Sequence, residues 1–392
     1  MMPEPQSPTL EPDAAQREQL AAVRAALRRF IDARGGWIGF DEYLGQVLYA
    51  PGLGYYSAGA VKFGSAGDFI TAPELSPLFG GCVARHCAPL LRAGSDLLEL
   101  GAGSGALAEA LLTRLDTLGA LPSRYLILET SADLRARQRE RLQRLPAPLS
   151  QRVAWLDALP ARPLRGVILA NEVADALPFQ CFAARVDGFD EWGVALDPAG
   201  EPIWSVRPAA GALQAELERI DAVLPSKLTP GYRSEVCLRA GPWIDALAAA
   251  LEYGCLLLFD YGFGRAELYH PQRTAGTLRC HYRHRALENP FLYPGLQDIS
   301  AWVDFTRLAE AASAAGLEVA GYCTQAAFLL GAGIDAELTS AGDALARAKL
   351  ASEARQLLLP GEMGESFKAL LLTRGAMPAM PGFGVQDLRR LL

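Results

Sequence analysis

Short apolar runs alternate with amphipathic runs through the first half of the chain. The apolar runs have the length of buried parallel strands, and the amphipathic runs repeat apolar residues at helical spacing. The predicted strands are 96–100, 124–129, 152–156 and 165–170, and the predicted helices are 78–92, 105–118 and 131–144. Strands that alternate with helices imply a mostly parallel sheet with right-handed crossovers. The pattern therefore predicts an α/β fold.

This alternation breaks after residue 180. Residues 181–206 contain three alternating strand-like runs, separated by an Asp187-Gly188 turn and a Pro198-Ala-Gly turn, which predicts an inserted antiparallel meander. An irregular segment at 263–299 follows later. The remaining predictions are a helix at 241–253, a strand at 255–259, a helix at 301–315, a strand at 317–322, helices at 334–357 and a strand at 367–373.

The N-terminal region is predicted to be helical and to end in a long loop. Ala14–Ala33 and Phe40–Tyr49 have amphipathic patterns, and the second run stops at Pro51-Gly52. Residues 54–80 hold five glycines together with aromatic side chains. A loop of that length is more than a connection and is typical of a binding loop.

Composition narrows the class of protein. The chain has 392 residues, 51% of them hydrophobic, and a formal net charge of −7, which suits a packed core and argues against a general nucleic-acid surface. No apolar run approaches the ~20 residues that span a bilayer, and the N-terminus has no leader pattern, so we expect a cytoplasmic location without membrane contact. The seven cysteines form no C-x-x-C pair, and the four histidines form no metal motif; we therefore expect no metal.

The most informative stretch is Leu97–Leu112, in which an apolar strand passes through three alternating glycines into a helix. Gly101, Gly103 and Gly105 can adopt backbone angles closed to other residues and leave room for a ligand against the main chain. The N–H groups at the start of the following helix favour a negatively charged group or a ribose. This pattern predicts a nucleotide site for either a dinucleotide or S-adenosylmethionine.

Of two acidic residues near the turn, Glu99 favours S-adenosylmethionine, whereas Glu129 suits either cofactor. Glu99 stands two residues before the first glycine, where dinucleotide folds keep the strand apolar, and Glu129 ends the next strand, where a carboxylate can bind ribose hydroxyls. The chain also lacks the Tyr-x-x-x-Lys pair of short-chain dehydrogenases. A dinucleotide-dependent enzyme that transfers hydride is therefore the weaker alternative to an enzyme that uses S-adenosylmethionine.

A third strand end carries the candidates for chemistry. Asn171, Glu172 and Asp175 follow the strand at 165–170, and the two acids stand three residues apart at a predicted helix start, which would place them on one face. The alternative is a structural role, because acids in a first helical turn stabilise it by about 0.3–1 kcal/mol each. Further along, Asp298 lies near another predicted helix start and is expected to cap it.

The order of these motifs resembles one methyltransferase family. The chain is similar to the MidA family of S-adenosylmethionine-dependent methyltransferases from about residue 38 to 374. The segments that carry the resemblance are GDFITAPELSPLFG at 67–80, ELGAGSG at 99–105, ANEVADALPF at 170–179, the run at 276–312 and MGESFKALLLTR at 363–374.

The resemblance implies a fold and a division of the chain. It implies a class I, Rossmann-like methyltransferase: a mostly parallel seven-stranded sheet with helices on both faces, an N-terminal helical extension and inserted antiparallel strands and helices. We expect residues 1–80 to form the extension and a loop over the cofactor. Residues 81–392 would form the methyltransferase domain, with insertions at about 181–240 and 263–300.

The resemblance also implies a set of cofactor residues. Glu99, Gly101, Gly103 and Gly105 would hold the methionine part of S-adenosylmethionine, Glu129 its ribose, and Asp157 its adenine. The loop over the cofactor contributes four further candidates, although its Thr-x-Pro-Glu pattern also suits a helix start. These candidates are Asp68, Thr71, Pro73 and Glu74.

The methyl acceptor is the open question at this point. Relatives in the family include a mitochondrial complex I assembly factor that methylates an arginine, which implies a protein arginine N-methyltransferase acting on a complex I-type subunit. Asn171, Glu172 and Asp175 would then orient the guanidinium. The alternatives are a methyltransferase for a small molecule or another protein residue, and an S-adenosylmethionine-binding assembly factor with little catalysis. The sequence does not indicate an oligomeric state.

Overall fold

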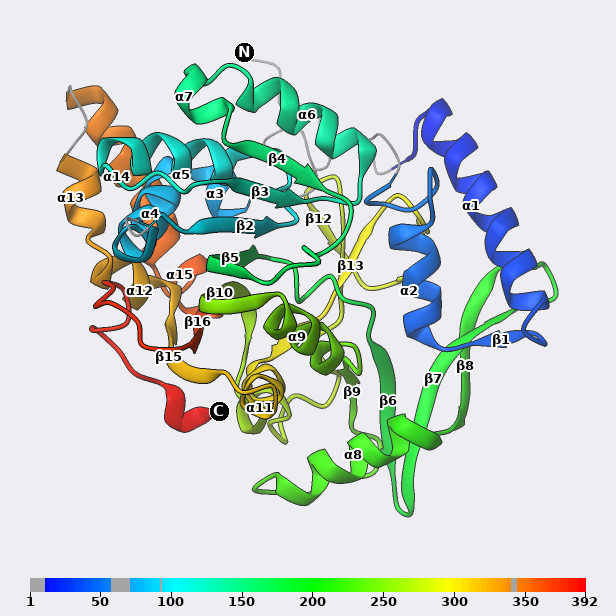
Figure 1. The fold of residues 1–392 in the computed structure, drawn as a ribbon. Coiled ribbons are helices and arrows are strands. Elements are labelled where there is room, and N and C mark those ends of the chain that lie inside the picture. The colour runs from blue at the N-terminus through cyan, green and yellow to red at the C-terminus, as the bar shows by residue number, and fades with distance from the viewer. Residues whose placement is uncertain (1–10, 58–70, 92–93, 340–343) are drawn as a thin grey trace, which may run out of the picture.

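A large twisted sheet organises the protein (Figure 1). The computed structural model describes residues 11–57, 71–91, 94–339 and 344–392. Seven strands follow the order β15-β16-β10-β5-β2-β3-β4, and short β14 joins β10 as the eighth. The strands are β2 (Asp96–Leu100), β3 (Tyr125–Leu128), β4 (Val153–Leu156), β5 (Leu164–Asn171), β10 (Leu251–Phe263), β14 (Val303–Asp304), β15 (Glu318–Thr324) and β16 (Phe367–Arg374).

The strand order places a topological switch beside β2. From β2 the chain moves outward to β3 and β4, then returns to the opposite side of β2 as β5; all of these pairings are parallel. Only β16 runs against its neighbours β10 and β15. In such open sheets a ligand binds beyond the carboxyl ends of the strands, at the point where the order reverses. The predicted mostly parallel seven-stranded α/β sheet is confirmed.

Alternate residues of the strands contribute to two hydrophobic cores, one on each face of the sheet. Leu97 and Val167 pack with α4 and α5 on one face, whereas Leu98 and Ile168 pack with α9 and α11 on the other. Because both faces are covered, the strands are apolar throughout rather than alternating. The main helices are α4 (Pro77–Leu91), α5 (Ala106–Thr117), α6 (Ala132–Leu142), α9 (Ala240–Ala249), α11 (Phe305–Ala314), α12 (Gln325–Gly331), α13 (Ile334–Thr339) and α14 (Ala344–Leu358).

Two smaller sheets lie beside the central one, on the right and behind it in Figure 1. The first is antiparallel with the order β1-β7-β6-β9, β8 pairing with β7, and it contains the predicted meander. The second has the order β12-β11-β13. Their strands are β1 (Trp37–Ile38), β6 (Gln180–Arg185), β7 (Gly188–Leu196), β8 (Pro202–Pro208), β9 (Arg233–Val236), β11 (Arg279–Tyr282), β12 (Arg285–Leu287) and β13 (Asp298–Ser300).

The N-terminal helices pack against the smaller sheets. Helices α1 (Ala14–Asp32) and α2 (Phe40–Tyr49) match the predicted segments closely, and a capping box at Asp13 starts α1. Both helices bury their apolar faces against β7 and the segment around β13. The N-terminal segment is thereby attached to the inserted sheets; the division of the chain into an extension and a domain stays a prediction.

Several predicted elements have different bounds in the structure. The helix predicted at 241–253 ends at Ala249, because Leu251 and Tyr253 pair with β5 and extend β10 by four residues. The helix predicted from 301 begins at Phe305, since Asp304 caps it by accepting a hydrogen bond from the Arg307 N–H. Asp298 is therefore not a helix cap; it lies in β13.

The sequence pattern missed several helices. The additional helices are α3 (Ala72–Leu75), α7 (Ala147–Ser150), α8 (Gly211–Val223), α10 (Arg265–Leu268), α12 (Gln325–Gly331), α15 (Met363–Ser366) and a final 3₁₀ turn at Arg389–Leu391. Helix α3 lies inside the segment predicted to be a loop. Among the described residues, no helix is long and apolar enough to cross a membrane.

Candidate active site

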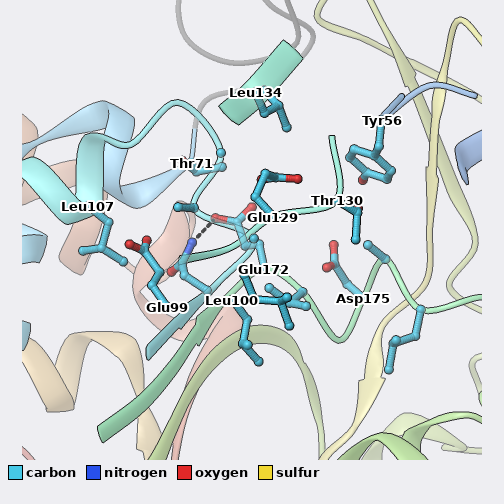
Figure 2. A pocket seen from close by; sticks show the side chains of 18 of the residues that line it. Tyr56, Thr71, Glu99, Leu100, Leu107, Glu129, Thr130, Leu134, Glu172 and Asp175 are labelled. Atoms are coloured by element: carbon cyan, nitrogen blue, oxygen red, sulfur yellow. Dashed lines mark hydrogen bonds between the residues drawn. The ribbon is translucent and has the colours of Figure 1, made fainter. Parts of the chain in front are cut away.

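A cavity of about 790 Å³ lies at the carboxyl ends of β2, β3 and β5, which is the switch point of the sheet. Its volume falls in the range of cofactor and small-molecule sites. The lining includes Glu99 from β2, Glu129 after β3, and Glu172 after β5. Figure 2 shows these side chains around the same space. The strand ends that the sequence singled out thus meet in one place.

The glycine turn forms one wall of the cavity. Gly101 and Gly105 have φ values of 59° and 84°, which side-chain-bearing residues rarely adopt. A Cβ on Gly101 would lie 3.3 Å from Val173 Cγ2, a tight contact that would require the Val173 side chain to shift. Gly101 and Gly103 line the cavity; Gly105 instead starts α5, immediately behind it.

Glu99 is buried beneath the turn. Its side chain is 2% exposed and accepts a hydrogen bond from the Tyr125 hydroxyl at 2.6 Å. Burial raises the pKa of Glu99 to about 7, although the Tyr125 hydrogen bond acts in the opposite direction. A bound ammonium group would stabilise the ionised form, so Glu99 is suited to hold an amine.

Glu129 is fixed by the start of α6. Its Oε1 accepts a hydrogen bond from the Ser131 N–H at 2.9 Å, and its Oε2 accepts one from Gln138 Nε2 at 3.1 Å. Each carboxylate oxygen has two lone pairs, so acceptor capacity remains for two ribose hydroxyls. Burial raises the pKa of Glu129, and these hydrogen bonds lower it.

The segment at α3 brings three of the predicted loop residues to the cavity. Thr71, Pro73 and Glu74 line it, and Glu74 accepts a hydrogen bond from the Ser104 hydroxyl of the glycine turn. The helix start suggested by Thr-x-Pro-Glu also forms, with Pro73 in its first turn. Binding and helix-start interpretations therefore apply together. Asp68 lies outside the described residues.

Asp157 is placed away from the cavity. Its side chain is 93% exposed, and its carboxylate forms an ion pair with Arg135 at 2.7 Å. Arg135 is itself held by the carbonyls of Glu129 and Leu156, so the ion pair draws Asp157 toward the protein surface. Within the described chain, the cavity lining near this position comes from Leu159 and not from Asp157. The adenine contact predicted for Asp157 is not supported by this placement.

The helix predicted to start at Glu172 does not form. Residues 172–179, all of them described, form turns, bends and irregular chain between β5 and β6. Glu172 has φ 54°, a left-handed conformation that is uncommon for a residue with a side chain, and its N–H donates to the Phe259 carbonyl at 2.9 Å. The structural role in helix capping is therefore wrong. Backbone strain of this kind concentrates at functional sites.

The last residue of β5 and two acids of this loop nevertheless line the cavity. Asn171 Nδ2 donates a hydrogen bond to Glu172 Oε1 at 3.2 Å, and Asp175 lies on the far side of Glu172 from the glycine turn. Burial, followed by the charge of Asp175, raises the pKa of Glu172 to about 8. Burial raises that of Asp175 to about 6, against the hydrogen bond from Tyr261. Loop geometry, rather than helical spacing, brings the two acids together.

The far end of the cavity is formed by residues that were not among the predicted site residues. Tyr49 and Tyr56 reach it from the N-terminal segment, Tyr261 from the end of β10, and Asp298 from β13. Asp260, next to Tyr261, accepts hydrogen bonds from the Ala174 and Asp175 N–H groups and so holds the loop. Asp260 and Tyr261 directly follow the predicted strand at 255–259, so the sequence marks them as a polar strand end; Tyr49, Tyr56 and Asp298 carry no comparable local signal.

Comparison with known proteins decides the family. A family model of S-adenosyl-L-methionine-dependent methyltransferases, Methyltransf_28, matches residues 82–323. This chain belongs to that family. The MidA-like resemblance of the sequence is thereby confirmed, the enzyme is a methyltransferase, and S-adenosyl-L-methionine is its cofactor. Glu99, Glu129 and the glycine turn form an acidic cradle that fits the amine and ribose of this cofactor.

Similar proteins support the same assignment. A crystal structure from Burkholderia thailandensis, bound to S-adenosyl-homocysteine, is 44% identical, with a TM-score of 0.92, and covers 97% of this chain and 99% of that one. The protein arginine methyltransferase NDUFAF7, mitochondrial, of Danio rerio is 30% identical over 85% of this chain and 82% of its own length. The Homo sapiens protein of the same name is 29% identical over 86% and 80%, respectively.

Because the pKa of Glu172 is raised, we expect the free energy of unfolding of the ligand-free methyltransferase to fall as the pH rises. The pKa of this group rises from 4.5 in the unfolded chain to about 8, so the protonated form favours folding below pH 4.5 and that stability is lost as the pH rises to 8. We expect Glu172→Gln to match the wild type near pH 4.5 and to exceed its free energy of unfolding by about 4 kcal/mol at pH 8, at about 1.36 kcal/mol for each unit of pKa. Urea denaturation at both pH values measures the difference. Equal stability of the two proteins at pH 8 would contradict it.

Proposed function

We propose that this methyltransferase is a protein arginine N-methyltransferase, acting on a subunit of respiratory complex I type. The observation that carries the proposal is Asp175. Its side chain is 8% exposed, and among the described residues its Oδ1 has no hydrogen-bond partner. A buried carboxylate oxygen without a hydrogen bond destabilises the folded protein, so we infer that a bound ligand supplies the donor. The relatives named protein arginine methyltransferases favour a guanidinium as that donor.

The charge of the site suits a cation. Glu172 and Asp175 stand together at the end of β5, and Asp260 lies directly behind them. A guanidinium presents a flat fork of N–H donors that binds carboxylates in pairs, and it stays charged at neutral pH. Binding of the acceptor would therefore lower the energetic cost of the two carboxylates and orient one guanidinium nitrogen.

The bound cofactor supplies an electrophilic methyl carbon. A lone pair of the acceptor nitrogen forms the N–C bond, while the bond from carbon to sulfur breaks and its electron pair stays on sulfur. Holding the two reactants in line contributes roughly 7–11 kcal/mol to such a reaction. The acceptor nitrogen must also lose a proton. Asp175, whose pKa is about 6, is placed to accept it, and Glu172 holds the remaining N–H groups.

Labelled methyl groups test the acceptor class. The protein is incubated with labelled S-adenosylmethionine and a lysate of cells that lack its gene, and the labelled product is mapped. We expect a labelled protein with the methyl group on arginine, because the cavity combines a cofactor cradle with acidic residues. A labelled metabolite without labelled protein would indicate a small-molecule methyltransferase. The absence of any transfer, with normal cofactor binding, would indicate an assembly factor.

The location of the protein is a separate proposal. The sequence leads us to propose a cytoplasmic enzyme, whereas the relatives carry the word mitochondrial in their names. A protein acceptor remains the proposed partner.

A further inference from the structure

Two residues far apart in the sequence close the acceptor end of the cavity. Tyr56 follows α2 in the N-terminal segment, and Asp298 lies in β13 of the three-stranded sheet. The Tyr56 hydroxyl donates a hydrogen bond to Asp298 Oδ1 at 2.7 Å, and both side chains line the cavity. Figure 2 shows the Tyr56 ring and the Asp175 carboxylate directed toward the same space. Neither Tyr56 nor Asp298 belongs to the central sheet.

Aromatic contacts fix the ring of Tyr56. It stacks on Tyr49 with a centroid distance of 5.4 Å and an interplanar angle of 30°, and the edge contact to Tyr55 is 5.1 Å. Tyr49 in turn donates a hydrogen bond at 2.5 Å to the carbonyl of Ala176, the neighbour of Asp175. The orientation of Tyr56 is thereby tied to the loop that carries the two acids.

Asp298 adds buried negative charge to this end of the site. Its side chain is 5% exposed. Burial and, after it, the Asp298 carboxylate raise the pKa of Tyr56 far above its ordinary value, so the hydroxyl stays protonated and remains a donor. The Asp298 charge also contributes to the raised pKa of Glu172. Together with the unpaired Oδ1 of Asp175, this buried charge indicates a cation as the missing partner.

We propose that Tyr56 and Asp298 are the positioning pair of the acceptor subsite, and that this subsite binds a guanidinium ion. The hydrogen bond between them holds an aromatic face and a carboxylate at fixed positions opposite Asp175. A guanidinium can place its flat face against a tyrosine ring and direct its N–H edges to carboxylates. The inference rests on the proposed arginine specificity. It adds that residues outside the central sheet supply that specificity.

Binding of a small guanidinium compound tests the pair without methyl transfer. The full chain is saturated with S-adenosyl-homocysteine, and calorimetry measures the Kd of Nα-acetylarginine amide. Nα-acetylcitrulline amide is the matched probe, since it has a similar shape without the charge. We expect the arginine amide to bind at least 10-fold more tightly than the citrulline amide. Equal affinity for the two probes would overturn the inference.

Two conservative variants then test each partner. Asp298→Asn removes the charge, and Tyr56→Phe keeps the ring but removes the donor; each should weaken arginine amide binding about 10-fold, within the range for hydrogen bonds to charged groups. The affinity for S-adenosyl-homocysteine should not change. Tyr232→Phe is the control, because Tyr232 donates a long hydrogen bond of 3.5 Å to the His270 carbonyl and lies outside the cavity lining.

The outcomes separate positioning from a general structural role. Because the two residues act through one hydrogen bond, the double variant should lose less affinity than the product of the single losses. Equal losses of arginine amide and S-adenosyl-homocysteine binding in Tyr56→Phe would overturn the proposal, even if Asp298→Asn does not fold. If the wild type binds arginine amide selectively and yet methylates no arginine protein, the proposed function fails and the guanidinium site stands.

Discussion

Replacing Asp175 with asparagine should lower the rate constant of methyl transfer about 100- to 10,000-fold, the usual contribution of a positioned general base. Asparagine keeps the size of the side chain but neither carries the charge nor accepts a proton. Asp175 lines the acceptor half of the cavity, and its Oδ1 has no partner among the described residues. The measurement is a single-turnover rate with the acceptor protein identified by labelling, at saturating S-adenosylmethionine.

Cofactor affinity separates this effect from damage to the fold. The Kd for S-adenosylmethionine should stay within about 2-fold of the wild type, because the cofactor candidates Glu99 and Glu129 are unchanged. Asp245→Asn, an exposed change on α9, serves as the matched control and should transfer methyl groups at the wild-type rate. Wild-type transfer by Asp175→Asn would remove this residue from the proposed chemistry.

The cofactor half of the site could be predicted from the sequence because its signals are local. The glycine turn, Glu99 and Glu129 lie at the ends of two consecutive strands, and an apolar strand pattern locates those ends. Parallel strand order then brings the ends together. The same rule locates the strand end near Asp157 but not the direction of its side chain, which in this structure pairs with Arg135 outside the cavity lining.

The loop after β5 shows where periodicity fails. Glu172 and Asp175 have helical spacing, but the Glu172 N–H donates a hydrogen bond to the Phe259 carbonyl of β10. The N–H groups of Ala174 and Asp175 donate hydrogen bonds to the Asp260 carboxylate. These interactions satisfy the backbone without a helix. The partners come from a strand almost ninety positions further along, so local propensity could not reveal them.

The acceptor half of the site depends on contacts that no local pattern encodes. Tyr56 and Asp298 are 242 positions apart, and each looks unremarkable in its own segment: a tyrosine after a turn and an acid before a predicted helix. Their meeting depends on the packing of α2 and the three-stranded sheet against each other. The specificity of the methyltransferase is consequently harder to predict than its cofactor.

Replacing Glu129 with alanine should weaken S-adenosylmethionine binding about 100-fold, because two hydrogen bonds from ribose hydroxyls to a charged acceptor would be lost. Its carboxylate lies at the cavity wall with acceptor capacity to spare beyond Ser131 and Gln138. Fluorescence or calorimetric titration with S-adenosylmethionine and S-adenosyl-homocysteine measures the loss. Both ligands share the ribose, so both should weaken equally.

A change confined to α6 provides the comparison for Glu129. Glu140→Ala removes an exposed carboxylate whose partner is Arg144, four residues further along and just past the end of α6, and should leave the affinity for both ligands unchanged. Glu129→Gln should fall between the two, since its amide still offers one oxygen to the ribose but no charge. If Glu129→Ala bound both ligands as tightly as Glu140→Ala does, the ribose would have to be held by other groups. The backbone around the glycine turn would then be the first place to look, because it forms the adjacent wall of the cavity.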